Sequence, residues 1–152
     1  MKTWVKVVGG VAIGLIAMQL IPVDKVNQPV KSNEDFIKIH HTPESVSSIM
    51  KRACYDCHTN ETNYPSYANI APISWSVKNH VNQGRTYMNW SVWGTYNNDL
   101  KKGMIEKTIN SIDKKTMPIN GYLIYHPEAH LTDKERQILV DYFKGISESK
   151  MY

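Results

Sequence analysis

Two cysteines and a histidine stand together in the segment CYDCH, and they are the residues of this chain best suited to chemistry. Cys54 and Cys57 are the only cysteines among 152 residues, and His58 directly follows the second one. Three kinds of site use such a pair: a redox-active dithiol, a zinc site and the attachment point of a c-type haem. The rest of the sequence must decide between them.

The first two kinds of site find little support in the sequence. A thioredoxin-like dithiol lies near a βαβ unit, and no run of alternating apolar residues predicts strands here. A structural zinc site needs four ligands. With no further cysteine, histidines at no recognised spacing would have to complete it: His40, His41, His80, His126 and His130. Both readings therefore remain minor alternatives.

The pattern C-x-x-C-H is the attachment signature of c-type haem. Two thioether bonds hold both vinyl edges of one porphyrin, and the residue that follows then lies under the iron. The spacing predicts one haem c, attached covalently by Cys54 and Cys57, with His58 as an iron ligand. A helix predicted over residues 43–53 leads directly into the motif and would hold its geometry.

Met117 is the best candidate for the sixth iron ligand. It lies in the loop KKTMPINGY between two predicted helices, and Pro118 stiffens that loop. A thioether favours reduced iron, so His/Met coordination suits electron transfer. The alternative is that Met117 belongs to an ordinary packing loop. His80, on a predicted middle helix, would instead give bis-histidine coordination, whereas His126 is interpreted as a surface or capping group.

Short helices are expected to position these residues. The apolar spacing predicts them over residues 43–53, 73–83, 98–113 and 132–145. Thr42 and Pro43 are expected to start the first helix, and Gly84 to end the second. Thr132 and Glu135 form a capping box at the last. The folded part is therefore all-α, with a small core that would gain from an apolar cofactor.

The N-terminus predicts a membrane anchor. Residues 7–23 carry no charge, Lys2 and Lys6 precede them, and no convincing cleavage site follows. An uncleaved transmembrane helix over residues 1–23 would keep its basic end on the cytoplasmic side of the membrane. A cleaved signal peptide is the alternative. In both cases the remainder is expected on the periplasmic side of the cytoplasmic membrane.

The expected domain order follows from these segments. It comprises an anchor in contact with membrane lipid, a polar tether, a haem-binding domain and a short tail: residues 1–23, 24–41, 42–147 and 148–152. The net charge of +4 is spread along the chain without a block of like charges, so nucleic-acid binding is not expected.

The order of these features resembles the single-haem class I c-type cytochromes: a helix, CYDCH, middle helices, a Met-Pro loop and a C-terminal amphipathic helix. In more detail, CYDCHTNETNYP, IAPISW, GR, MP and YHPEAHLT are similar to the anchored bacterial haem-binding-domain family, over most of residues 35–146. The resemblance implies a cytochrome c-like domain around one covalent haem. It also implies that Tyr142 and Phe143 of the last helix pack on the helix before the motif.

Two departures from the cytochrome pattern matter. The Gly-Pro that usually follows the haem motif is absent, so a carbonyl near Pro72 is expected to orient His58. The aromatic stretch over residues 75–93 is also richer than in small carriers. Arg85 is the candidate partner of the haem propionates. Three aromatic residues could join it or could simply be core: Tyr87, Trp90 and Trp93.

These features predict a membrane-anchored c-type cytochrome that exchanges electrons with redox partner proteins in or at the membrane, and not an enzyme. Two alternatives stay open. One is a haem-based sensor or small-ligand-binding module whose iron is open or bis-histidine. The other is a haem peroxidase, which would need a distal His–Arg arrangement such as His80 with Arg85.

Overall fold

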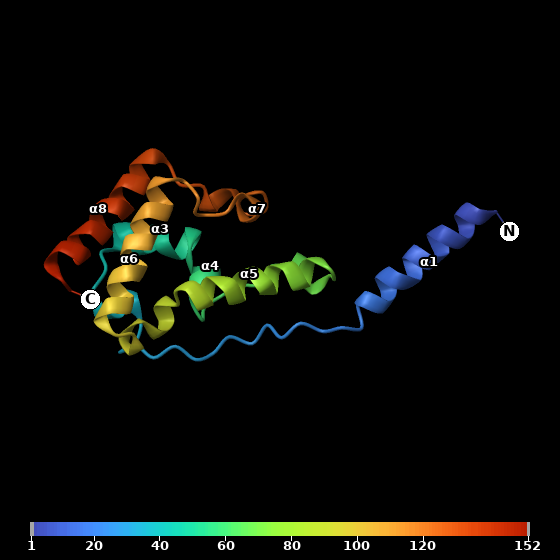
Figure 1. Ribbon diagram of the computed structural model, residues 1–152, viewed down its shortest axis with the longest axis horizontal. Helices are drawn as coiled ribbons and strands as arrows, with labels where there is room; N and C mark the ends of the chain where they lie inside the picture. Colours follow the sequence, from blue (N-terminus) through green and yellow to red (C-terminus); the bar gives the residue numbers. More distant parts are fainter. Residues whose placement is uncertain (1, 152) are drawn as a thin grey trace.

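The computed structural model describes residues 2–151, and all regular structure in that range is helical (Figure 1). The expected all-α class is confirmed. In chain order the α-helices and 3-10 helices are α1 (Thr3–Met18), α2 (Phe36–Ile39), α3 (Glu44–Ala53), α4 (Tyr55–His58), η1 (Ser66–Asn69), α5 (Ile73–Tyr87), η2 (Trp90–Thr95), α6 (Asn98–Asp113), α7 (Asn120–Leu123), η3 (Pro127–Ala129) and α8 (Asp133–Ser149).

One aromatic core holds the helices together. Phe36 of α2 is fully buried and lies edge-on to Trp93 of η2, with 5.1 Å between ring centres. Trp90 stacks on Phe143 of α8 at 6.3 Å. Met50 of α3 belongs to the same buried cluster. The expected packing of the last helix on the helix before the motif is therefore confirmed.

The chain joins this core earlier than residue 42, where the folded domain was expected to start. Asp35 caps α2 by accepting a hydrogen bond from the Lys38 amide at 3.1 Å. This places Phe36 under the core aromatics. The chain between α1 and Asp35 is largely extended (Figure 1).

Of the two predicted helix starts, one is confirmed and one is wrong. The capping box of Thr132 and Glu135 is present at the start of α8. The expected N-cap role of Thr42 is wrong, because Pro43 occupies that position in α3. The Thr42 hydroxyl instead forms a 2.8 Å hydrogen bond with the hydroxyl of Tyr142, and so joins the start of α3 to α8.

The predicted transmembrane anchor is not supported. α1 contains 16 residues, which corresponds to about 24 Å of helix. Within residues 2–151, no helix is both long enough and apolar enough to cross a membrane. The helix ends at Met18, ahead of Pro22, and the uncharged residues that follow continue as a turn and extended chain.

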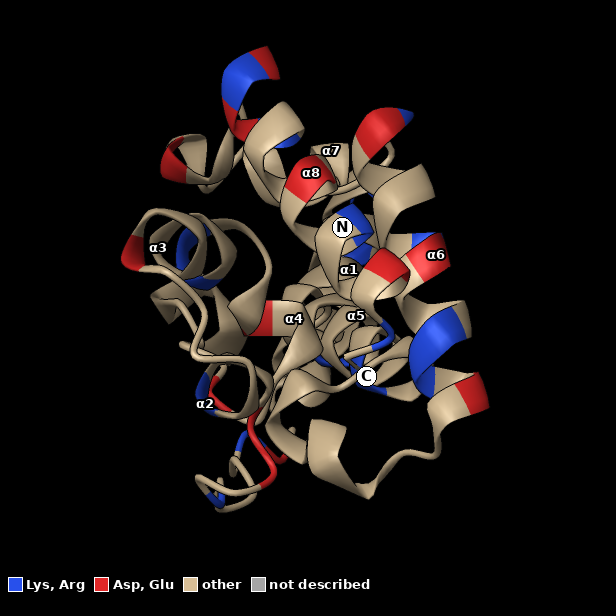
Figure 2. Cartoon of the chain, turned by 90° about the vertical axis from the view of Figure 1, so that its left-hand side faces the viewer, with Lys and Arg blue, Asp and Glu red and all other residues tan. Residues whose placement is uncertain are grey.

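Charged residues do not gather on one side of the chain. Basic and acidic positions are interspersed along the helices in the view of Figure 2. An ion pair between Lys115 and Asp133 (2.6 Å) and another between Arg52 and Glu135 join separate segments. Much of the charge is therefore balanced locally.

Candidate haem-binding site

The CYDCH motif forms the junction of α3 and α4. Cys54 ends α3, and its carbonyl oxygen accepts hydrogen bonds from the amides of Cys57 (3.2 Å) and His58 (3.0 Å). Residues three apart on a helical turn lie on one face. Both cysteines are partly buried and form no disulfide. Of the two, Cys57 lines the cavity described below, whereas Cys54 packs against the core cluster.

Both thiols are held in their protonated form. Burial raises the pKa of the Cys54 thiol to about 12, and Cys57 adds to the rise. Burial likewise raises the pKa of the Cys57 thiol to about 11. A redox-active dithiol needs a thiolate, and its attacking cysteine has a lowered pKa. This environment disfavours the dithiol interpretation.

His58 is fixed by the end of α5. Its Nδ1 lies 3.1 Å from the carbonyl oxygen of Met88, so this nitrogen carries the proton. Burial lowers the pKa of His58 and outweighs the opposing hydrogen bonds to the backbone, so the ring is neutral. A neutral ring that donates from Nδ1 presents a lone pair at Nε2, ready to bind a metal. The expected role of a carbonyl near Pro72 is therefore wrong.

Gly84 lets the backbone of α5 pack directly against the backbone of the motif. A Cβ atom at this position would lie 2.9 Å from the carbonyl carbon of Cys57 and closer still to its oxygen. Only a residue without a side chain fits there. The prediction that Gly84 ends this helix is wrong, because α5 continues to Tyr87. The glycine reflects close packing on the motif.

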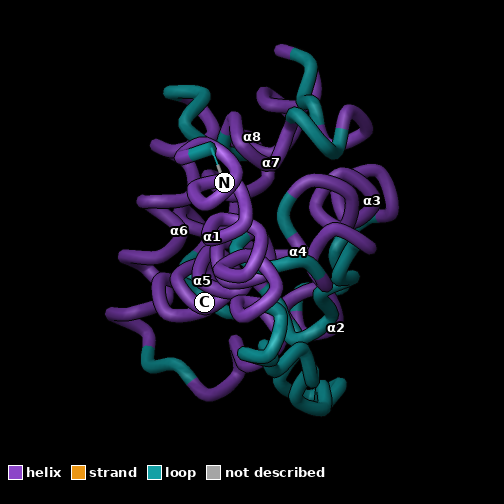
Figure 3. The backbone as a smooth tube through the Cα atoms, turned by 90° about the vertical axis from the view of Figure 1, so that its right-hand side faces the viewer, coloured by secondary structure: helices purple, strands orange, loops and turns teal. Residues whose placement is uncertain are grey.

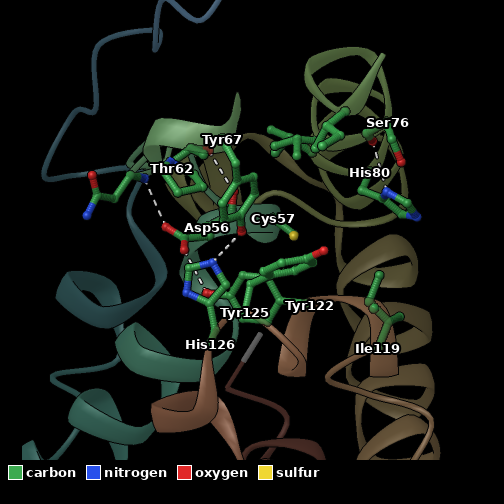
Figure 4. Close-up of a pocket in the computed structure, with 16 residues that line it drawn as sticks. Asp56, Cys57, Thr62, Tyr67, Ser76, His80, Ile119, Tyr122, Tyr125 and His126 are labelled. Carbon is green, nitrogen blue, oxygen red and sulfur yellow. Dashed lines mark hydrogen bonds between the residues drawn. The ribbon is translucent and has the colours of Figure 1, made fainter. Parts of the chain in front are cut away.

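Asp56, a variable position of the motif, ties the motif to two other segments. One carboxylate oxygen accepts a hydrogen bond from the Tyr122 hydroxyl at 2.7 Å, and the other from the Asn63 amide at 2.9 Å. The backbone carbonyl of Asp56 accepts a hydrogen bond from the Thr62 hydroxyl at 2.6 Å. Figure 4 shows Asp56 among these partners. Sequence reasoning missed this residue, because C-x-x-C-H assigns no role to its variable positions.

Arg85 holds the loop that follows the motif. Its Nε donates to the carbonyl of Thr59 at 2.8 Å. Its Nη2 donates to the hydroxyl of Thr62 at 2.9 Å and to the side-chain oxygen of Asn27 at 2.7 Å. A propionate contact by Arg85 stays a prediction. Of the aromatic candidates, two are buried in the core and one is exposed: Trp90, Trp93 and Tyr87, respectively.

Replacing Arg85 with methionine is expected to destabilise the protein by about 1–3 kcal/mol, because a charged donor to three oxygen atoms is lost while the apolar stem remains. Urea denaturation of the purified protein measures this change. Lys102→Met, which removes an exposed cation from α6, should leave the stability nearly unchanged. An Arg85→Met protein of normal stability but altered redox potential would contradict the loop role and favour the propionate role.

A cavity of about 180 Å³ opens beside Cys57 (Figure 4). One wall is a face of α5 that carries Ile73, Val77 and Val81 at helical spacing. Ile119 contributes to the opposite side. An apolar slot with a cysteine at its edge fits a flat, mainly apolar ligand that the cysteine can bond.

The two candidates for a sixth ligand differ in their position relative to the cavity. His80 lines the cavity, and its Nδ1 donates to the Ser76 carbonyl at 2.9 Å, which leaves Nε2 available (Figure 4). Met117 does not line the cavity, and 38% of its surface is exposed. Its carbonyl accepts a 2.8 Å hydrogen bond from Arg136, whose charge also opposes the rise in the pKa of Cys54. Arg136 therefore holds the backbone at Met117.

An unexpected polar cluster also borders the cavity. The Tyr67 hydroxyl lies 2.8 Å from Nε2 of His126, and the Nδ1 of His126 lies 2.9 Å from a carboxylate oxygen of Glu128. The Tyr122 ring stacks on the imidazole at 4.1 Å. His126 is therefore a packed wall residue rather than a surface group. Sequence reasoning missed this role because the Tyr67 contact joins positions 59 residues apart.

A polar cleft of about 490 Å³ adjoins the cavity. It is lined by charged residues that include Lys51, Arg52 and Glu61. Four residues line both the cleft and the cavity, so one layer of side chains separates the two spaces: Asp56, Asn63, Tyr122 and His126.

A zinc site finds no ligand set in this structure. Within residues 2–151, no three His, Cys, Asp or Glu side chains converge as metal ligands. Cys57 instead lines an apolar cavity, and the neutral His58 follows it directly in the chain. This leaves the haem interpretation of the motif.

An all-helical domain with a C-x-x-C-H turn beside an apolar cavity is a haem-binding protein in its architecture. The comparison with known families agrees. The family described as the haem-binding domain matches residues 13–145, and the chain belongs to that family. No curated protein and no solved structure matches the chain. The likeness to class I cytochromes stays a prediction.

Proposed function

We propose that the protein is a single-haem c-type cytochrome that carries electrons at the membrane. Thioether bonds from Cys54 and Cys57 attach one haem, and His58 binds its iron. Electrons pass between redox partner proteins in or at the membrane. No substrate bond is made or broken.

The setting of His58 supports this proposal most strongly. The Met88 carbonyl fixes the ring, burial keeps it neutral, and its neighbour Cys57 lines the apolar cavity. A backbone carbonyl on Nδ1 selects the tautomer of a metal-binding histidine and makes Nε2 a better donor. The ligand is thus oriented before the cofactor binds.

The surrounding residues hold the site rigid and keep water out of it. When bound, the haem supplies the one-electron chemistry at its iron. Asp56 and Arg85 hold the motif and its following loop through hydrogen bonds, so the ligand geometry changes little as charge changes. Val77 and Val81 exclude water from the α5 wall. Low polarity around a haem tunes its potential.

We assign the sixth position to Met117. Arg136 and the Ser111 carbonyl hold the backbone of Met117, the latter through a 3.3 Å hydrogen bond from the Met117 amide. His80 is the alternative, because it lines the cavity with Nε2 available. Coordination by His80, or an open iron, would favour a haem-based sensor or ligand-binding module.

We also propose that α1 attaches the protein to the cytoplasmic membrane, with the haem domain on the periplasmic side. The helix is apolar and exposed along its length, with Lys2 and Lys6 near its start. Basic residues at the start of such a segment stay on the cytoplasmic side. In bacteria, haem attachment to C-x-x-C-H occurs outside the cytoplasm, which agrees with this placement.

Haem is expected to remain on the polypeptide through extraction with acidic acetone, because thioether bonds survive this treatment. The mass of the purified protein should include one haem. A double variant, Cys54→Ala with Cys57→Ala, should release its haem into the acetone, whereas His80→Ala should retain it. Haem that leaves the unaltered protein would refute covalent attachment.

A further inference from the structure

Four exposed apolar side chains belong to the two short segments, 70–73 and 124–125, that border the cavity, and we name them the apolar rim: Ile70, Ile73, Ile124 and Tyr125. Their exposed fractions are 55%, 44%, 73% and 60%. Ile73 and Tyr125 also line the cavity. The Tyr125 ring packs on Tyr67 of η1 at 4.9 Å, which joins the two sides of the rim. Such a cluster is typical of an interaction surface.

The segment after α1 is pinned to the structure behind the rim. The side-chain amide of Gln19 donates to the Ala71 carbonyl and accepts from the Ala71 amide, both at 3.0 Å. Ala71 lies between Ile70 and Ile73. Further along, the Asn27 side chain donates to the carbonyl of Thr62 at 2.9 Å. The end of α1 is therefore fixed beside the rim.

As a result, α1 and the rim lie on the same side of the molecule. In Figure 1, α1, the start of α5 and α7 all lie toward the right, whereas α8 lies at the left. Figure 3 looks from that side, with α1 nearest the viewer. Leu20 (80% exposed) and Ile21 (58%) continue the apolar surface from α1 toward the rim.

We propose that the apolar rim docks on the surface of a lipid bilayer, so that the mouth of the haem cavity faces the membrane. This inference rests on the proposed attachment of α1 to the membrane. Lipid is the occupant that fits, because α1 beyond Lys6 is apolar around its whole circumference rather than along one stripe. A helix that enters a protein groove needs only one apolar face. Together, α1 and the rim form one continuous surface for lipid.

The test uses the full-length holoprotein and vesicles of phosphatidylcholine with phosphatidylglycerol. Haem occupies both native cysteines, so a nitroxide can be placed on Ile124→Cys and, as a control, on Leu100→Cys at the start of α6 away from α1. Bound protein should show a label at residue 124 that is accessible to oxygen in the lipid and protected from a water-soluble nickel chelate. The label at residue 100 should show the reverse.

A second measurement does not depend on labels. Ile70→Asp combined with Ile124→Asp should lower the vesicle partition coefficient about tenfold, because two apolar side chains lose their lipid contact. Leu100→Asp should leave the coefficient unchanged. Circular dichroism should show equal helix content in all variants.

The outcomes separate the two proposals. If the unaltered protein fails to float with vesicles, both membrane attachment and rim docking are wrong. If it floats while residue 124 stays as exposed to water as residue 100, attachment holds and rim docking is overturned. A rim that is buried only when a second protein is added would likewise overturn the lipid assignment.

Discussion

Met117→Ala is expected to open the haem iron to carbon monoxide. The unaltered ferrous protein should resist this ligand, because a sulphur ligand fills the sixth position and keeps the iron low-spin. The ferric protein should show the weak far-red sulphur-to-iron absorption, which the variant loses. The potential should fall, since a thioether stabilises reduced iron. Absorption spectra and a redox titration measure all three changes.

The matched control is His80→Ala, which removes the competing ligand. Arg136 and Ser111 hold the backbone of Met117, so Met117→Ala should keep this loop in place. His80→Ala should leave the far-red absorption and the carbon monoxide resistance intact. If His80→Ala alone opens the iron, the coordination is bis-histidine and the sensor function gains support.

Gly84→Ala is expected to destabilise the protein by about 1–3 kcal/mol, although alanine favours helices over glycine. The new methyl group would overlap the Cys57 carbonyl, so α5 must move away from the motif. Because the same helix ends at the Met88 carbonyl that orients His58, the haem spectrum should change as well. Urea denaturation and the absorption spectrum measure the two effects.

Gly103→Ala provides the control for Gly84→Ala. Gly103 also lies inside a helix, but a Cβ atom there would meet no neighbour within 4 Å. This variant should gain about 0.5–1 kcal/mol from helix propensity and keep a normal spectrum. Equal stability changes in the two variants would contradict the close crossing of α5 and the motif.

The parts of the fold that the sequence predicted are those with local signals. The capping box at Thr132 and the helical spacing of Leu139 and Phe143 placed the start of α8 and its buried face correctly, although the helix continues past the predicted end at Gly145 to Ser149. The motif made Cys54 and His58 candidate site residues from spacing alone, and their roles stay predictions. In each case the residues that carry the signal lie within a few turns of one another.

The parts that escaped prediction depend on partners far along the chain. A glycine in a helix has the same local appearance whether it ends the helix or faces another backbone, and only Cys57 distinguishes the two for Gly84. Phe36 joins the core through a helix of four residues, which is too short to show a period. Asp56 gains its role from Tyr122, 66 positions away.

The shared wall of Tyr122 and His126 has a consequence for electron exchange. Electronic coupling between a cofactor and a partner weakens steeply with the distance between them. The layer of side chains between the cavity and the polar cleft includes the stacked rings of Tyr122 and His126. On the proposed function, a redox partner that settles in this cleft comes within one side chain of the cofactor, without any opening of the domain.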